Sequence, residues 1–481
     1  MGFTDVAPSV FDPGLSVTEV ATTGLSELDG DAGELRIRGY PIEDVAEHAT
    51  YETVAWLLFD GDPPTNDELR AFDDDLTAAR ALTDRERNLV EAGVAADVPV
   101  MDVLRVGLGA GSFRTDAADA LRATRRVVAI CPSLAAAYWR IQCGLDPVTP
   151  QGDLSHAANF LYMLSAAEPD DALVTGLETY LVTISEHGLN PSTFAARIAG
   201  STGSDPYSAA TAAVGVLKGP RHGGALERVH SMLDSIDDET DLATLAATRV
   251  ENDSLPGFGH SVYDVRDPRA SIVERAAEHV FAQRNSSAYL ETARAFEAAV
   301  ADHLADEHPE RALRVNVDYY AAVLLRGLEV PPELFIATFA VGRAAGWMAH
   351  YLEQLEREQL LRPRTRYVGP DARPWTPPGE DSGQPSASAL ERLSSTLDTL
   401  SDRTRLELLT VLYDATEPLS YSTLRSRTSI DDKGRYNYHL RQLRGVFVET
   451  VDGGYSLTEA GEESVQTLLD DVQPLNTTAD E

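Results

Sequence analysis

The feature that most constrains the fold is a helical periodicity that continues for some 320 residues. From about residue 41 to residue 360, apolar residues recur at a spacing of three to four, with turn signals between the runs. This spacing places apolar side chains on one face of a helix. Sustained alternation of apolar and polar residues, which is typical of strands, is nearly absent. We predict a large, mainly α-helical domain, with helices covering residues 52–59, 121–140, 172–186 and 291–304 and strand-like segments only before about residue 41.

A change of character near residue 362 predicts a second domain. Six prolines fall between residues 362 and 389, without apolar periodicity. We therefore divide the chain into a domain over residues 1–370, a Pro/Gly/Ser-rich linker over 371–388, and a smaller domain over 389–481. In the smaller domain we predict helices over 401–412, 422–426 and 432–444, a hairpin over 446–457 around Asp-Gly-Gly, and a last helix from Thr458.

The most unusual property of the composition is its net charge. The 481 residues include 77 acidic and 40 basic ones, a net charge of −37, and only Lys218 and Lys433 are lysines. An acidic surface with almost no lysine resembles the proteins of salt-accumulating halophiles, because carboxylates hold water and cations while salt screens their mutual repulsion. An ordinary acidic protein is the alternative. Neither interpretation concerns activity.

Several classes of protein are excluded. No apolar stretch of about 18 residues occurs, so we expect no membrane span. The N-terminus lacks the pattern of a secretion signal, so we expect a cytoplasmic protein. Cys131 and Cys143 are too few for a disulfide framework, and no metal-ligand spacing appears. We expect no metal and no cofactor.

Four segments combine ionisable residues with glycines or with apolar runs: 186–190, 219–224, 256–260 and 314–320. Glycines beside a histidine let backbone or ligand approach closely. An aspartate at the apolar start of a helix either pairs with a buried partner or does chemistry. These patterns single out His187, His222, His260 and Asp318 as candidate site residues, although a structural role for each of them stays open.

Further motifs make the chain resemble the citrate synthase family over about residues 14–370. The segments that carry the resemblance are 154–164 (LSHAANFLYML), 190–197 (NPSTFAAR), 267–270 (DPRA), 342–350 (GRAAGWMAH) and 362–364 (RPR). The resemblance implies an all-helical homodimer in which each subunit has a large domain and a smaller mobile one, here at about 220–325. It also implies an active site between these domains that uses both subunits.

The resemblance further implies a condensation of oxaloacetate with acetyl-CoA, in which acetyl-CoA is a substrate. Asp318 would remove a methyl proton, His222 would donate a hydrogen bond to the thioester carbonyl, and His260 would polarise the ketone. Such a weak carbon acid needs a base and an oxyanion donor together. The Gly-Pro before His222 predicts a helix start that would favour a neutral imidazole.

The dicarboxylate would be held by His187, Arg269, Arg343 and, from the partner subunit, Arg362, since guanidinium groups bind carboxylates at two points. Departures from the family concern the CoA site. A basic residue common in the family is replaced by Ser261, another by Asp264, and an asparagine by Leu226. Asp264 would repel the CoA phosphate. We expect CoA contacts from Arg266 and Arg364 instead.

The C-terminal domain resembles the winged helix-turn-helix domains of archaeal transcription regulators. The segment 432–444 would be the recognition helix and 446–457 the wing. Nine basic and eighteen acidic residues over 381–481 predict weak nonspecific attraction to DNA, so specific contacts would have to contribute more. A solvated basic helix is the alternative. The candidate DNA contacts are Lys433, Arg435, Tyr436, Asn437, Arg441 and Arg444.

Two functions follow for the whole chain. The first is a working citrate synthase fused to a DNA-binding domain. The second is a metabolite-sensing transcription regulator whose synthase-like domain retains the dicarboxylate pocket but no longer turns over CoA. His222, His260 and Asp318 together favour the first, while Asp264 and Leu226 favour the second. A 2-methylcitrate synthase that uses propionyl-CoA is a further alternative.

Overall fold

The computed structural model describes residues 11–472, except 16, 114–118, 238, 285–286, 309–312, 371, 373–374, 376–386 and 452. The chain divides into two compact units, unit 1 (Met1–Arg364) and unit 2 (Thr365–Glu481). Most of the predicted linker, 371–388, lies outside the described residues. Within the described part, no helix is long and apolar enough to span a membrane.

Unit 1 begins with a small antiparallel sheet in the order β1 (Ser26–Asp29), β2 (Glu34–Ile37), β3 (Tyr40–Pro41), with Leu28 opposite Leu35. Among the described residues of unit 1 after this sheet, the named elements are all helices, and one isolated antiparallel bridge joins Phe258 to Val315. The helices of the first half are α1 (Ile42–His48), α2 (Tyr51–Asp60), α3 (Asn66–Arg80), α4 (Asp84–Ala95), α5 (Val100–Gly109), η1 (Ala110–Phe113), α6 (Ala120–Gln142), α7 (His156–Ser165), α8 (Asp171–Ile184) and α9 (Pro191–Ser201).

Short polar caps explain where many of these helices begin. Backbone N–H groups at the starts of α8, α9 and α10 (Pro206–Leu217) donate hydrogen bonds to the side chains of Asp170, Asn190 and Asp205. Helix α8 ends at Ile184, earlier than predicted, which frees residues 185–190 to form a loop. The later helices are α10 (Pro206–Leu217), α11 (Ala225–Asp234), α12 (Leu242–Glu251), α13 (Pro268–Gln283), α14 (Ala288–Glu307), α15 (Val317–Gly327), η2 (Pro332–Leu334) and α16 (Phe335–Glu356).

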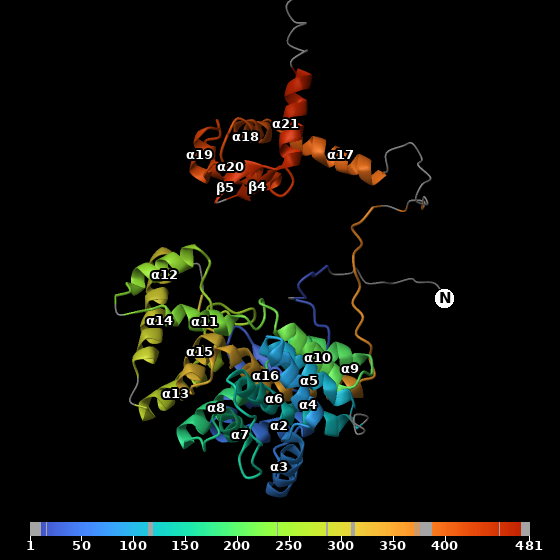
Figure 1. Ribbon diagram of the computed structural model, residues 1–481, viewed down its shortest axis with the longest axis vertical. Coiled ribbons are helices and arrows are strands. Elements are labelled where there is room, and N and C mark those ends of the chain that lie inside the picture. Colours follow the sequence, from blue (N-terminus) through green and yellow to red (C-terminus); the bar gives the residue numbers. More distant parts are fainter. Residues whose placement is uncertain are drawn as a thin grey trace, which may run out of the picture. The chain divides into compact units, whose positions relative to one another are not determined.

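Helix α16 is the centre of unit 1 (Figure 1). Every residue from 335 to 351 is buried, so the helix is covered on all sides, chiefly by α6, α9 and α10. Two glycines allow close packing against the loop after α8. A Cβ added to Gly342 would lie 2.6 Å from Ile184 Cγ1, and one added to Gly346 would lie 2.3 Å from Ser185 O. The loop therefore lies directly on the helix.

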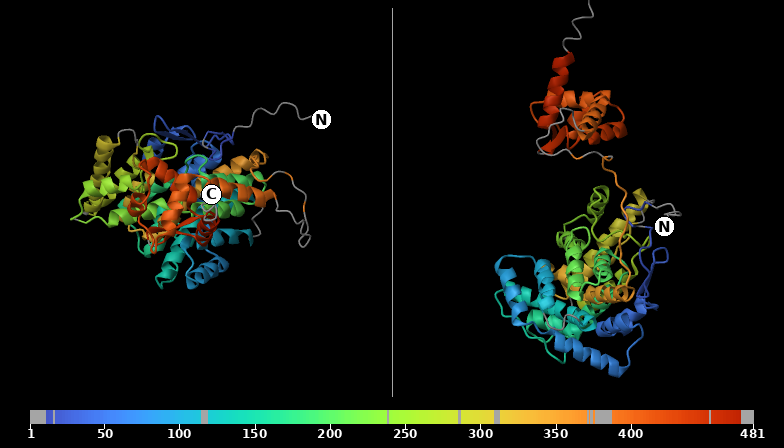
Figure 2. Two further views of the ribbon diagram at one scale, coloured as in Figure 1. Left: turned by 90° about the horizontal axis from the view of Figure 1, so that it is seen from above. Right: turned by 90° about the vertical axis from the view of Figure 1, so that its right-hand side faces the viewer.

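Helices α11 to α14 lie together at one side of unit 1, drawn in green and yellow (Figures 1 and 2). They include most of the segment 220–325 that was predicted to form the smaller domain. Helix α13 packs on α15 and also on α8, so this group is continuous with the rest of unit 1. Its mobility remains a prediction.

Unit 2 has its own apolar core, formed by residues such as Leu408, Leu424, Leu440 and Phe447. The predicted helices and hairpin are all present. Leu419 pairs with Tyr455 and so joins the segment before α19 to the antiparallel hairpin. The elements are α17 (Ala387–Leu400), α18 (Arg403–Tyr413), α19 (Tyr421–Ser426), α20 (Lys433–Leu443), β4 (Val448–Val451), β5 (Gly454–Leu457) and α21 (Glu459–Val472).

Candidate active site

His222 lies in the turn between α10 and α11. The prediction that Gly219 and Pro220 start a helix here is wrong, because the backbone N–H of His222 bonds to Gly219 O in a tight turn and α11 begins only at Ala225. The imidazole is neutral for another reason: burial, and then the positive charge of Arg343, lower its pKa to about 4.

Ser192, which the sequence analysis did not single out, orients His222. Its Oγ lies 2.9 Å from His222 Nε2 and 2.8 Å from Asn190 Oδ1, and it accepts a hydrogen bond from Trp347 Nε1 at 3.1 Å. The hydroxyl has one hydrogen, so it can donate to only one of the first two atoms. Asn190 Oδ1 also accepts a hydrogen bond from the backbone N–H of Thr193. Asn190 Oδ1 therefore still has a donor if the Ser192 hydroxyl donates to His222 instead.

The loop between α12 and α13 fixes the tautomer of His260. Its Nδ1 accepts the backbone N–H groups of Val262 at 3.0 Å and Tyr263 at 3.2 Å. In the neutral ring the hydrogen is therefore on Nε2. Burial and then the charge of Arg269 lower the pKa of His260 to about 4, against the opposing effect of Asp267. The ring is a neutral donor through Nε2.

His187 lies on the loop after α8, beside His260. The two ring centroids are 5.2 Å apart in an edge-to-face arrangement, and Tyr263 Oη lies 3.2 Å from His187 Nε2. Burial, then Arg269 and Arg343, hold the pKa of His187 well below its usual value. Residues from two distant segments of the chain thus form one wall of the site.

A buried ion pair joins the starts of α13 and α15. Arg269, only 3% exposed, donates from Nε and Nη2 to Asp267 at 3.0 and 2.8 Å. Asp267 Oδ2 also accepts the backbone N–H of Val317, the first residue of α15. Arg269 Nη2 also lies 3.4 Å from His260 Nε2. Arginine only donates, but the two shorter bonds to Nδ1 decide the tautomer, so the guanidinium and the Nε2–H lie side by side as two donors.

Asp318 is the second residue of α15, positioned by Asn316, whose side chain accepts the backbone N–H of Asp318 at 3.0 Å. Burial raises the pKa of Asp318 to about 6, although the Arg269 charge opposes the shift. A carboxylate in this state is a stronger base than one in water.

Arg343 lies on the buried helix α16 and is 2% exposed. Its Nε donates to the carbonyl of Ile184, and its guanidinium lies 4.7 Å from the centroid of the Phe339 ring. After burial, its charge is one of the causes that shift the pKa values of His222, His187 and Asp318. Among the described residues, no group of three or more potential metal ligands comes together.

A second hydrogen-bond network, which the sequence analysis missed, connects the loop after α8 to α16. His350 on α16 lies 3.0 Å from Glu186 Oε1 through Nε2 and 2.9 Å from Arg197 Nη1 through Nδ1. Arginine only donates, so His350 donates from Nε2 to Glu186. Burial would raise the pKa of Glu186, but His350 and Arg343 hold it below its usual value. Glu186 belongs to the segment 186–190 and His350 to the motif 342–350, so the sequence contained both residues of this pair but not their contact.

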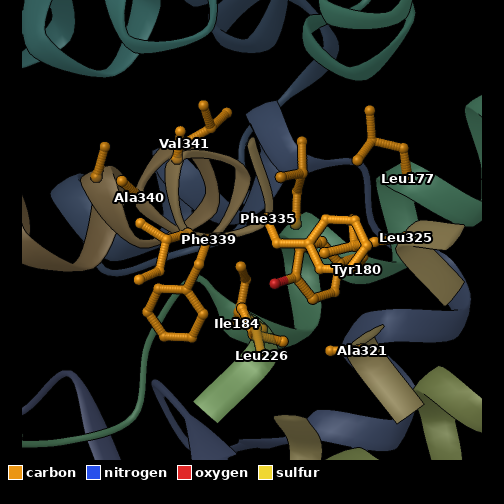
Figure 3. Close-up of a cluster of buried hydrophobic side chains, with 14 of the residues drawn as sticks. Leu177, Tyr180, Ile184, Leu226, Ala321, Leu325, Phe335, Phe339, Ala340 and Val341 are labelled. Atoms are coloured by element: carbon orange, nitrogen blue, oxygen red, sulfur yellow. The ribbon is translucent and has the colours of Figure 1, made fainter. Parts of the chain in front are cut away.

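Three residues depart from the family pattern, and they lie in two different environments. Leu226 is buried in the apolar cluster of α8, α11 and α16, near Ile184 and Phe339 (Figure 3), so it fills the core. Ser261 and Asp264 are exposed. The structure does not favour Arg266 as a CoA contact, because its guanidinium is paired with Glu274 at 2.7 Å and Glu297 at 3.5 Å.

Arg362 and Arg364 lie on the extended segment that follows α16, and both are exposed. Within the part of the chain that the structure describes, neither bonds to His187, Arg269 or Arg343. A role for Arg362 in the site of a second subunit and for Arg364 in CoA binding remain predictions.

In unit 2, the prediction that Tyr436 contacts DNA is wrong, because its side chain is 0% exposed and belongs to the core. Tyr438, two residues on, is 52% exposed on the same helix. Asn437 accepts a hydrogen bond from Tyr421, and Arg435 donates to Thr404 Oγ1. Arg444 caps α20 and lies over the Tyr455 ring. Lys433 and Arg441 are exposed.

Comparison with known proteins agrees with this geometry. The family model described as citrate synthase, C-terminal domain, matches residues 14–364, and one described as a domain of unknown function (DUF7347) matches residues 394–468. The citrate synthase of Haloferax volcanii is 40% identical over 380 residues, which cover 76% of this chain and 98% of that protein.

Two solved structures are also similar. The citrate synthase of Pyrobaculum aerophilum has a TM-score of 0.68 and 33% identity, covering 76% of this chain and 94% of that one. The citrate synthase of Thermoplasma acidophilum, in a ternary complex with carboxymethyl coenzyme A and oxaloacetate, has a TM-score of 0.70 and 27% identity, covering 77% of this chain and 99% of that one. This chain belongs to the citrate synthase family and is an acyltransferase of the citrate synthase type.

Proposed function

We propose that unit 1 condenses acetyl-CoA with oxaloacetate to give citrate and CoA, with Asp318, His222 and His260 as the catalytic residues. The observation that carries this proposal is the neutral His260 ring with its hydrogen on Nε2, next to the Arg269 guanidinium. A neutral donor beside a cation is suited to the ketone of an anionic substrate.

In this mechanism Asp318 takes a proton from the acetyl methyl group, because its raised pKa makes the carboxylate a stronger base. Ser192 donates its hydroxyl hydrogen to His222 Nε2, which leaves Nδ1–H as the donor to the enolate oxygen. The enolate carbon attacks the ketone, and His260 Nε2–H protonates the new alkoxide. Water then hydrolyses the citryl thioester and releases CoA.

The large negative charge of the chain bears on the salt concentration at which the protein works. We propose that the protein works in the cytoplasm of a salt-accumulating cell, because 77 acidic residues repel one another unless salt screens them. An assay of this chain therefore belongs in molar salt.

The decisive measurement is the release of CoA thiol from acetyl-CoA in the presence of oxaloacetate. We expect turnover by the full chain, and a loss of about 10²–10⁴-fold in kcat for Asp318→Ala, because that is what a positioned general base contributes. Absence of turnover above the Asp318→Ala background would favour the metabolite-sensing regulator. Propionyl-CoA in place of acetyl-CoA, compared by kcat/KM, tests the 2-methylcitrate alternative.

The same assay predicts a pH dependence. Asp318 must be ionised to act as a base, so kcat/KM should fall about tenfold per pH unit below its pKa of about 6. The pKa values of His222 and His260 lie near 4, so both rings stay neutral in this range. A profile that stays flat from pH 7 to pH 5, with stability unchanged, would contradict the role of Asp318.

We further propose a homodimer in which Arg362 of one subunit completes the dicarboxylate site of the other, together with His187, Arg269 and Arg343. Support comes from the exposed position of Arg362 and from the two buried guanidinium groups that it would join. Three arginines match two carboxylates by two-point hydrogen bonding.

Mixing two inactive variants tests this arrangement. A heterodimer of Arg362→Ala and Asp318→Ala subunits contains one site with both residues intact, so random reassembly should restore about a quarter of the wild-type activity. Each variant treated alone in the same way is the control. No recovery on mixing, with mixed dimers shown to form, would rule out a shared site.

For unit 2 we propose a winged helix-turn-helix domain that binds DNA through α20, with the β4–β5 hairpin as the wing. The supporting observation is the exposed face of α20, where Lys433, Tyr438 and Arg441 stand out from an acidic chain. A helix presented beside a hairpin has the element order of this class.

A binding measurement with fragments of the host genome tests this proposal. Arg441→Ala and Lys433→Ala should each weaken binding to a selected fragment by about tenfold and lower its dependence on salt. Arg122→Ala, an exposed arginine of unit 1, removes the same charge elsewhere and should have no effect. Equal effects of all three variants, or no selected fragment at all, would refute specific binding through α20.

A further inference from the structure

The turn between β1 and β2 (residues 29–33) lies against the loop that carries His260. A Cβ added to Gly30 would lie 2.1 Å from Val262 O, and the backbone N–H of Asp264 donates to Gly30 O at 3.2 Å. A Cβ added to Gly33 would lie 2.6 Å from Val265 Cγ2. Segments more than 200 residues apart in the chain are therefore in backbone contact.

The same hairpin also touches the loop after α8. The Ser26 hydroxyl donates to Glu186 Oε1 at 2.9 Å and accepts the backbone N–H of Gly188 at 3.2 Å. Leu28 packs against Gly188, where an added Cβ would lie 2.8 Å from Leu28 Cδ1. The hairpin thus joins the two loops that carry His187 and His260.

The contact with Val262 bears directly on the chemistry. The Val262 N–H is one of the two donors that occupy His260 Nδ1, while the Val262 carbonyl faces Gly30. The Val262 carbonyl also belongs to the same rigid peptide plane as the backbone N–H of Tyr263, which is the second donor to His260 Nδ1, at 3.2 Å. Displacing the carbonyl therefore reorients the loop and weakens the hydrogen bond to the ring.

We propose that the β1–β2 turn, through Gly30, is a positioning element for His260: it holds the Val262 backbone so that the ring keeps its hydrogen on Nε2, facing the substrate ketone. The inference rests on the proposed role of His260. It requires glycine at position 30, because any side chain there meets the Val262 carbonyl.

Gly30→Ala in the full chain tests the proposal, with Asp31→Ala as the matched control. Asp31 is an exposed residue of the same turn, so its loss should leave kcat within about twofold of wild type. We expect Gly30→Ala to lower kcat on the order of 10- to 100-fold while the KM for acetyl-CoA changes little, because a misplaced ring acts on the ketone step.

Nitrogen-15 NMR of the histidine rings provides a readout that needs no turnover. In wild type and Asp31→Ala, His260 should show an unprotonated Nδ1 and a protonated Nε2, whereas Gly30→Ala should show a mixture of tautomers. A folded Gly30→Ala with the wild-type tautomer and kcat would overturn the proposal. An inactive wild type with the expected NMR difference would overturn only the proposed function.

Val265→Ala decides the question where Gly30→Ala does not fold. Val265 is 41% exposed, so its truncation leaves the core intact, yet it removes the methyl group that faces Gly33. A drop of several-fold in kcat with an altered His260 tautomer supports the proposal, and wild-type values for both overturn it.

Discussion

The buried charge of Arg343 is the constraint on which the site depends. A guanidinium at 2% exposure is costly unless its hydrogen bonds and charge are compensated. Here Ile184 O accepts one N–H, the Phe339 ring faces the cation, and Glu186 supplies an opposite charge. The compensation is incomplete, since burial still lowers the pKa of Arg343 to about 10. An anionic substrate would complete it. Burial first, and this charge after it, also lower the pKa values of His187 and His222.

The network around Glu186 explains how the Arg343 charge is held close to the loop after α8. Gly342 and Gly346 let residues 184–186 lie on α16, and His350, one turn beyond Gly346, meets Glu186. Arg197 fixes the other side of the His350 ring. Arg343 and His350 thus lie on one buried helix among the small residues that let the loop approach it.

Much of this could be predicted from the sequence, and the limits have physical causes. Apolar periodicity located several helices because it reports burial on one face. For α16, which is buried on all faces, the sequence provided a family motif but no helix boundaries. The error at Tyr436 arose because helix periodicity leaves open which face of a polar helix is covered, and only packing against Leu408 and Leu424 decides it. The roles of Ser192 and Gly30 depend on contacts between segments far apart in the chain, which spacing does not report.

Charge is arranged differently on the surface and in the site. Surface carboxylates give the chain its net charge of −37 and would repel a dianionic substrate at low ionic strength. Arg269 and Arg343 are buried, and buried charges are screened by salt much less than exposed ones. High salt therefore removes the repulsion at the surface while the attraction inside the site persists. An acidic surface and a pair of buried arginines are compatible for this reason.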